Sequence, residues 1–351
     1  MAFPTAPGYN QFANGNFSPV IYSKKVQKAL RKSSVVEDVT NTDYAGEIAN
    51  FGDSVKIIKE PDITISNYAR GTTLATQDLT DVDFTMVVDQ ANYFQFAIDD
   101  IEEAHSHVNF MDLATDRAAY KLRDAFDQEV LGYIAGWEKD GNGDWVRRTS
   151  VSGTKQTASA DNDELLAAHK LDITDFGGSD LGQEAEITSI PLAAGGGTSG
   201  VTSPLAVLNR IARLMDQENV DTDGRWIVVD PVFAEILMDE DSKLINADFG
   251  GDGELRNGRM PGTIRGFRIY KSNNLPFIGT GPGTTAGSGS ETDFGVLVAG
   301  HDSAAATAQQ INKTESFRSP DTFADVVRGM QLYGRKLLRS EAMFTAAYNA
   351  A

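Results

Sequence analysis

The sequence contains no cysteine, which excludes disulfide bonds, thiolate metal sites and cysteine nucleophiles. It has only four histidines and no HExxH pattern. No apolar run approaches the roughly 18–20 residues that a membrane-spanning helix requires. The first residues have neither the basic nor the apolar segment of a secretory signal. These absences predict a chain with no membrane partner, no cofactor and no metal.

Positive charge is also scarce, because 31 Lys and Arg residues are set against 50 Asp and Glu residues, a formal net charge of −19. Phosphate contacts depend on positive charge, so this balance argues against a free protein that grips nucleic acid. The 351 residues are 41% hydrophobic and 23% charged, as in ordinary globular chains. The length predicts two domains, or one domain with large excursions.

The charge is unevenly placed along the chain. Residues 1–36 contain five basic residues and no acidic residue, so residues 37–351 carry −19 − 5 = −24. Ser18 and Pro19 are suited to begin a helix over about 18–32. Two interpretations of this basic arm remain open: a solvated terminal helix, or an arm that docks on an acidic neighbouring surface or faces nucleic acid.

A long β-hairpin is predicted after the arm. Apolar residues alternate from 55 to 65 and again from 81 to 89, which indicates two half-buried strands. The polar stretch 66–80 between them contains Arg70-Gly71 and has no apolar face. A two-stranded hairpin is only marginally stable alone, so we expect it to rest on a neighbouring subunit.

A second short strand is predicted at 94–98, followed by the acidic run 99–103 and by the longest helix signal, 109–135, with Asp112 in its first turn. Residues 137–203 are loop-rich, with weaker signals for strands at 145–148 and 187–190 and for a helix at 163–170. The pattern then indicates helices beginning at Ser203-Pro204 and Asp230-Pro231, and strands at 226–229, 262–270, 294–298, 307–317 and 323–348.

No constellation of catalytic residues stands out. Residues 140–144 imitate the opening of a calcium loop, but Trp145 and Val151 occupy the positions that need Gly and Glu, so a hairpin turn is the better interpretation. His105 and His107 could share a metal only on a strand. His301, Asp302 and Ser303 are adjacent in sequence, which does not support a triad, because triads are assembled in space.

The order of these elements resembles the major capsid proteins of tailed double-stranded DNA bacteriophages, which have the Hong Kong 97 type of capsid fold. The resemblance covers almost the whole chain except 137–203. It is carried by the ordered segments 41–47, 51–57 with Gly52-Asp53, 96–102, the long helix with Asp127 near its end, 219–231, 261–273 and 323–334.

The resemblance implies an α+β fold with four parts: an N-terminal arm (1–45), an extended β-hairpin loop (46–90), a peripheral domain (91–203 and 301–351, with a spine helix at about 109–135 and 137–203 as an insertion), and an axial α/β domain (204–300). It also implies hexamers and pentamers that enclose the phage DNA, in a virion assembled in the host cytoplasm. The short segment before Gly52 predicts a separate scaffolding protein or a mature chain. A portal is a further expected partner, and a decoration or cement protein an optional one.

The residues that we expect at contacts between subunits come from the basic arm, the hairpin and the acidic run. They are Lys24, Lys25, Lys28, Arg31, Lys32, Arg70, Gln77, Asp78, Asp99, Asp100, Glu102 and Glu103. Two alternative functions stay open on the sequence: an encapsulin-like compartment shell, and an acidic hydrolytic enzyme with paired carboxylates.

Overall fold

The computed structural model describes most of the chain from residue 34 onward. The described residues are 34–44, 54–59, 63–71, 73, 76–77, 82–100, 110–139, 143, 145–147, 165–166, 169–177, 189–193, 201–239, 263–278, 294–320 and 322–350.

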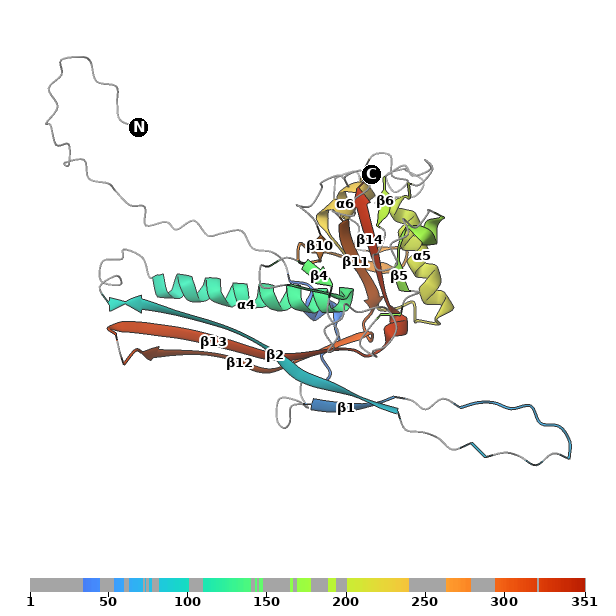
Figure 1. Cartoon of the computed structure of the whole chain (residues 1–351), viewed down its shortest axis with the longest axis horizontal. Coiled ribbons are helices and arrows are strands. Elements are labelled where there is room, and N and C mark those ends of the chain that lie inside the picture. The colour runs from blue at the N-terminus through green and yellow to red at the C-terminus, as the bar shows by residue number, and fades with distance from the viewer. Residues whose placement is uncertain are drawn as a thin grey trace, which may run out of the picture.

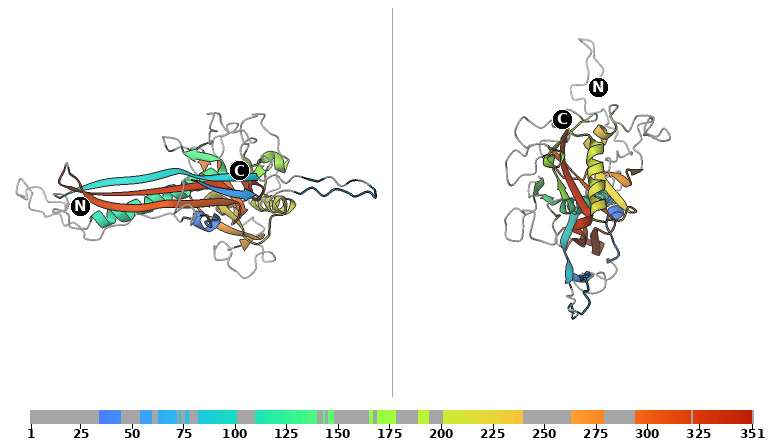
Figure 2. Two further views of the ribbon diagram at one scale, coloured as in Figure 1. Left: turned by 90° about the horizontal axis from the view of Figure 1, so that it is seen from below. Right: turned by 90° about the vertical axis from the view of Figure 1, so that its right-hand side faces the viewer.

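The molecule has an elongated part and a compact part (Figure 1). Three long strands and helix α4 extend to one side, and a hairpin projects to the other (Figures 1 and 2). The helices and 3-10 turns are α1 (Val36–Val39), α4 (Phe110–Ala135), η2 (Ile173–Phe176), α5 (Pro204–Gln217), α6 (Pro231–Leu237) and η4 (Ser340–Ala342). The strands are β1 (Ser54–Lys59), β2 (Val82–Asp99), β3 (Trp137–Lys139), β4 (Trp145–Arg147), β5 (Lys170–Leu171), β6 (Ile190–Leu192), β7 (Arg225–Val229), β8 (Thr263–Ile264), β9 (Phe267–Lys271), β10 (Phe277–Ile278), β11 (Phe294–His301), β12 (Ala305–Arg318), β13 (Ala324–Leu337) and β14 (Met343–Ala350).

The compact part is built on an eight-stranded sheet of order β5-β14-β11-β7-β9-β8, with β10 paired to β11 and β6 paired to β14. Neighbouring residues of β7 enter different apolar clusters: Trp226 joins the C-terminal half of α4, and Ile227 joins α5 and α6. Because side chains alternate along a strand, the sheet is covered by helices on both faces. This packing accounts for the continuous apolar runs at 226–229 and 294–298.

The two helices α5 and α6 begin where the sequence predicts. The Ser203 hydroxyl accepts a hydrogen bond from the Ala206 N–H group at 3.3 Å, and Pro204 occupies the first turn. The Asp230 carboxylate accepts one from the Phe233 N–H group at 3.0 Å. Each cap satisfies a backbone donor that the helix itself cannot pair.

The elongated part is a four-stranded antiparallel sheet of order β1-β2-β13-β12, with α4 along one face (Figures 1 and 2). The 26 residues of α4 confirm the predicted long helix, and Asp112 lies in its first turn. At 1.5 Å per residue, α4 is about 40 Å long. The predicted hairpin is also confirmed, because β1 pairs antiparallel with the first residues of β2.

Several predicted strands differ in extent. The strands expected at 81–89 and 94–98 are one strand of 18 residues, because the polar residues between them pair with β13 and Asn92 donates a hydrogen bond to Glu129 of α4. The strand expected at 262–270 is a hairpin of β8 and β9, since Arg265 and Gly266 both have positive φ. The run 323–348 is interrupted by η4 and forms β13 and β14.

The predictions for 137–203 were only partly right. The described residues within 163–170 form no α-helix; Lys170 and Leu171 instead pair with β14, and Leu171 is buried. The strand expected at 187–190 lies at Ile190–Leu192. The strand β4 is confirmed and pairs with β3, so residues 140–144 connect a hairpin, as the Asp- and Gly-rich sequence predicts.

The boundary expected at residue 301 does not separate the two sheets. β14 pairs with β11, β5 and β6 of the eight-stranded sheet, although its residues fall in the region assigned to the peripheral domain. It lies there because its apolar side chains, among them Met343 and Phe344, complete the apolar clusters on both faces of that sheet. The C-terminal strand therefore ties the two parts together.

Candidate intersubunit surfaces

Eight of the twelve residues expected at subunit contacts lie outside the described residues. They are the five basic residues of the arm, Asp78 of the hairpin, and Glu102 and Glu103 of the acidic run. The helix expected at 18–32, the pair His105 and His107, and most of residues 140–144 also lie outside. The roles assigned to these residues stay predictions.

The hairpin exposes apolar side chains to solvent. Beyond β1, every described residue up to Gln77 is exposed. Ile63 is 64% exposed and Ile65 is 93% exposed, although the sequence pattern predicts that both are half-buried. Tyr68 and Ile58 are exposed as well. The predicted half-burial of Ile63 and Ile65 is therefore wrong for the isolated subunit.

The two described hairpin candidates have different surroundings. The Gln77 side-chain oxygen accepts a hydrogen bond from the Thr64 N–H group at 3.0 Å, so it ties the two sides of the hairpin together. Arg70 lies in the exposed turn with Gly71, whose φ of 94° favours glycine. Arg70 is thus placed at the far end of the projecting hairpin, where a neighbouring molecule could reach it.

The acidic run begins at the end of β2. The Asp100 carboxylate forms an ion pair with Arg318 of β12, and Arg318 also lies 3.5 Å from Asp325. The hydrogen bond and the charge of Asp100 raise the pKa of the Arg318 guanidinium. The preceding residue, Asp99, is exposed to solvent. Part of the negative charge of this run is therefore already balanced within the subunit.

A second exposed surface lies on the four-stranded sheet. Asn92 contacts Glu129 of α4, so the alternation of β2 places Tyr93 on the opposite face, where it is 80% exposed. Met330 lies directly across from Tyr93 on β13 and is also exposed. We call the exposed side chains Tyr93, Met330 and Phe317 the outer sheet face. Phe323, near the turn between β12 and β13, is 79% exposed.

Charged side chains lie among these apolar groups. Glu315 of β12 forms ion pairs with Lys313 and with Arg328, the latter at 2.9 Å. The hydrogen bonds from Lys313 and Arg328 lower the pKa of the Glu315 carboxyl to about 2. The Arg328 guanidinium also stacks over the Phe317 ring, 5.0 Å from its centroid. This face is therefore mixed in character, as protein interfaces commonly are.

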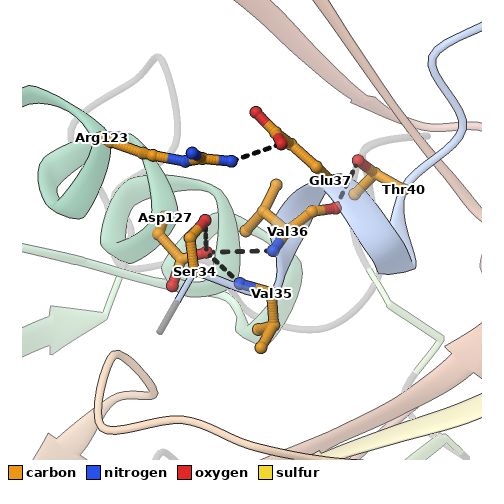
Figure 3. Close-up of polar contacts among 7 residues, drawn as sticks. All are labelled: Ser34, Val35, Val36, Glu37, Thr40, Arg123 and Asp127. Carbon is orange, nitrogen blue, oxygen red and sulfur yellow. Dashed lines mark hydrogen bonds and ion pairs between the residues drawn. The ribbon is translucent and has the colours of Figure 1, made fainter. Parts of the chain in front are cut away.

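Residues 34–41, which we call the anchor segment, attach the end of the basic arm to the body (Figure 3). Asp127 of α4 is fully buried, and its Oδ1 atom accepts hydrogen bonds from the Ser34 hydroxyl and from the N–H groups of Val35 and Val36, at 2.9, 2.9 and 3.0 Å. Its Oδ2 atom accepts one from Asn274 at 2.7 Å. Four donors thus satisfy one buried carboxylate.

The other end of the anchor segment is held by β12. The buried hydroxyls of Thr40 and Thr307 are hydrogen-bonded at 2.9 Å. The Asn41 N–H group donates to the Ala305 carbonyl at 2.8 Å, and the Thr307 N–H group donates to the Asn41 carbonyl at 3.0 Å. The anchor segment therefore adds a short parallel bridge to the edge of the four-stranded sheet.

Two other carboxylates, the half-buried Glu129 and the buried Asp230, are enclosed by neighbouring elements. Glu129 lies between α4 and the sheet, where it accepts hydrogen bonds from Tyr333 and Asn92, and burial raises its pKa. Burial also raises the pKa of Asp230, which caps α6 and accepts a hydrogen bond from Tyr348. Each carboxylate thus joins its own helix to a strand: Glu129 joins α4 to β2 and β13, and Asp230 joins α6 to β14.

His301, Asp302 and Ser303, which are all described, do not form a catalytic triad. The His301 ring contacts the Ser303 hydroxyl at 2.9 Å and the Asp223 carbonyl at 2.8 Å, while the Asp302 carboxylate pairs with Arg268. The Asp-His-Ser relay of a triad is therefore absent here. No group of three metal-binding side chains occurs in the described ranges. None of the described helices has the length and apolar character needed to cross a membrane.

Sequence reasoning missed the most connected residues. The sequence points to Asp127 only through the capsid-protein resemblance. The donors that bind its carboxylate lie 91 to 147 positions away in the chain. No short motif can report such a cluster. Tyr93 and Met330 were missed because the central residues of β2 carry no strong apolar alternation.

Together the two sheets, the long helix and the projecting hairpin define a mixed α+β fold. The same fold occurs in a structure from Mycobacterium phage Che8, with a TM-score of 0.67 and 24% identity over 95% of this chain and 98% of that one. The capsid structure of Cyanophage P-SCSP1u matches with a TM-score of 0.63 and 18% identity, over 95% of this chain and 94% of that one. The capsid of Ralstonia phage GP4 matches with a TM-score of 0.62 and 14% identity, over 97% and 98%.

The likeness lies in the fold rather than in the sequence. No protein-family model matches the chain, and the search of curated proteins found no match. The identities to the solved structures are low, but the coverage is nearly complete on both sides. The chain therefore has the fold of phage capsid structures.

Proposed function

We propose that this chain is the major capsid protein of a tailed double-stranded DNA bacteriophage, with the Hong Kong 97 type of fold. Its copies form hexamers and pentamers that close an icosahedral head around the genome. The observation that carries this proposal is the likeness in fold, over nearly the whole chain, to the capsids of Cyanophage P-SCSP1u and Ralstonia phage GP4. The role is structural rather than enzymatic.

The exposed surfaces support assembly. The hairpin, with Ile65 almost fully exposed, and the outer sheet face, with Tyr93 exposed, carry apolar side chains of the kind that commonly mark binding surfaces. A shell of identical subunits provides that partner, because each copy repeats the same contacts by symmetry. The hairpin corresponds in this proposal to the extended loop at 46–90, and α4 to the spine helix.

The remaining parts follow the same scheme. Residues 1–45 form the arm, 204–300 the axial region, and the long strands with α4 the peripheral region, to which β14 is joined through the other sheet. A separate scaffolding protein, a portal and a decoration protein are the proposed partners in the virion. DNA is packaged inside without sequence-specific contact, which suits a strongly acidic chain.

Assembly of the purified full chain tests the proposal. Light scattering and negative-stain microscopy should show hexamers, pentamers or shells that increase with concentration and with crowding agents. A particle of 37.9 kDa that stays monomeric under all these conditions would contradict it. Shells that carry an enzyme cargo instead of DNA would favour the encapsulin-like alternative.

The hairpin can be tested separately. Deletion of residues 67–78 should leave a folded subunit, since the described residues in this range are exposed and contribute no core. The melting temperature should change little, whereas closed shells should no longer form. Normal shells from this deletion would show that the hairpin is not a clamp between subunits.

A further inference from the structure

One carboxylate holds the N-terminal end of the anchor segment, where the basic arm joins the body. Three donors of the anchor segment converge on the Oδ1 atom of Asp127, and two of them are the backbone N–H groups of Val35 and Val36 (Figure 3). Val35 precedes α1 and offers no side-chain oxygen to cap it. Asp127, which lies about 90 residues away in the sequence, supplies the missing acceptor.

The same carboxylate is joined to the compact part. Its Oδ2 atom accepts from the Asn274 amide, and Asn274 lies in the turn that follows β9, where the Ser272 N–H group bonds to the Val229 carbonyl. The Asn274 oxygen in turn accepts from Gln128 at 3.3 Å. Asp127 therefore fixes the anchor segment against both α4 and the eight-stranded sheet.

The position of this junction determines where the arm begins. Lys32 lies two positions before Ser34 and Lys24 lies ten positions before it. A chain spans at most about 3.5 Å per residue, so all five basic residues lie within roughly 35 Å of the junction. Releasing the anchor segment would lengthen the freely moving chain by several residues. The positions of these five charges relative to the body would then be less well defined.

We propose that Asp127 is the positioning residue of the basic arm: it holds the anchor segment so that the five basic residues leave the body at a fixed point and reach a neighbouring copy of this chain. The role of the arm in contacts between copies rests on the proposed capsid function. The local part of the proposal, that Asp127 fixes the N-terminal end of the anchor segment, does not depend on assembly.

The central variant is Asp127→Asn. It keeps the size of the side chain but replaces one acceptor oxygen by an NH2 group, which then faces either the three donors of the anchor segment or the amide of Asn274. The double variant Asp127→Asn/Asn274→Asp restores the pairing, because the new amide can donate to the new carboxylate at position 274. The carbonyl oxygen at position 127 is then free to accept from the anchor segment.

Hydrogen exchange in unassembled subunits tests whether Asp127 holds the anchor segment. For Asp127→Asn we expect the amides of Val35 and Val36 to exchange about tenfold faster or more, as expected for loss of hydrogen bonds to a charged acceptor. The double variant should restore most of the protection. Arg123→Gln is the matched control, since it removes only the exposed Arg123–Glu37 ion pair on the same two elements, and it should leave these amides protected.

Three exchange results would overturn the proposal. Unchanged exchange at Val35 and Val36 in Asp127→Asn would mean that the carboxylate does not hold the anchor segment. An equal loss of protection at residues 126–134 of α4 would mean that Asp127 supports the fold in general rather than the arm. Failure of the double variant to restore protection would exclude hydrogen bonding as the cause.

The yield of shells tests whether Asp127 positions the arm for contacts between copies. Asp127→Asn should reduce the yield of shells in the otherwise unchanged chain. In a chain that already carries Lys24→Glu, Lys28→Glu and Arg31→Glu, the same substitution should reduce it no further, because the arm is already disabled. An additional loss there would show that Asp127 acts on assembly by another route. If the unchanged chain forms no shells at all, the proposed function fails while the exchange result still stands.

Discussion

The two sheets of this protein bury their strands in different ways. Every residue of β7 is buried, and so is every residue of β11 except His301. In β2, by contrast, every second residue from Val87 to Asp99 is exposed. Apolar clusters lie on both faces of the eight-stranded sheet, whereas α4 covers only one face of the four-stranded sheet.

This difference distinguishes the surfaces that stabilise the subunit from the surfaces that are left exposed for contacts with neighbouring molecules. Burial of apolar surface is the main favourable term in folding, so the eight-stranded sheet stabilises the isolated chain. The four-stranded sheet and the hairpin leave apolar side chains in water and stabilise an assembly only when they are covered. Substitutions in the two regions should therefore change different measured quantities.

The largest expected effect is in the compact core. Phe233 of α6 is fully buried and packs edge-to-face on Tyr348, with ring centroids 5.3 Å apart. Phe233→Ala should lower the free energy of unfolding by about 3–5 kcal/mol, because it removes buried surface and leaves a cavity. Phe323→Ala makes the same change at an exposed residue, and should alter it by less than about 0.5 kcal/mol. Equal losses in denaturant titrations would contradict the contrast.

The second effect concerns close packing within the four-stranded sheet. A Cβ atom at Gly334 would lie 2.6 Å from the Val87 carbonyl oxygen, which is backbone and cannot rotate away. Gly334→Ala should therefore destabilise the subunit by about 1–3 kcal/mol. At Gly329 the added atom would meet the ring of Phe94, a half-buried side chain that can turn aside. Gly329→Ala should cost less, and the reverse order in thermal melts would contradict this account.

The third effect is a pH dependence of opposite sign at two carboxylates. Burial raises the pKa of Glu129, so the folded state binds its proton more tightly than the unfolded state does. The free energy of unfolding should therefore fall as pH rises above the ordinary value of about 4.3. Glu315 has its pKa lowered to about 2 by Lys313 and Arg328, so its contribution is present above about 4.3 and is lost as the pH falls toward 2.

Unfolding of Glu129→Gln and Glu315→Gln, measured from pH 3 to pH 7 beside the unchanged chain, isolates these contributions. Relative to the unchanged chain, Glu129→Gln should gain stability as pH rises, and Glu315→Gln should lose it. The second change should be small, because Glu315 is at the surface, where solvent screens ion pairs. Parallel curves for all three proteins would show that neither carboxylate contributes as described.

Local signals in the sequence were sufficient for much of the fold. Ser203-Pro204 and Asp230-Pro231 predict helix starts because a cap and a proline act on adjacent residues. The apolar stripe of 109–135 predicts α4, and the period-2 patterns predict β1 and the start of β2. These features depend on neighbours within a few positions, and a single sequence contains all of that information.

Long-range pairing could not be predicted in the same way. The anchor segment meets Asp127 and Thr307, which lie far along the chain and carry no motif. Ile63 and Ile65 show a second limit: their alternation predicts half-buried side chains, but both are exposed, because an alternating pattern does not contain the position of the chain relative to the core. The sequence therefore predicts the projecting hairpin, whose contacts with other subunits stay a prediction, and gives no signal for the outer sheet face.

The smallest expected effect on subunit stability should accompany a clear effect on assembly. Ile65 of the hairpin and Tyr93 of β2 are both largely exposed, so Ile65→Ser and Tyr93→Ser remove little buried area from the isolated subunit. Each should change the free energy of unfolding by less than about 0.5 kcal/mol. Each should nevertheless reduce the yield of shells, because apolar and aromatic side chains contribute most of the binding energy at protein interfaces.

Asn67→Ser and Gln95→Ser are the matched controls, since both residues are exposed and polar and lie two positions farther along the chain. If the controls reduce assembly as much as the apolar substitutions do, then the hairpin and the outer sheet face act through backbone shape rather than through the side chains that they expose.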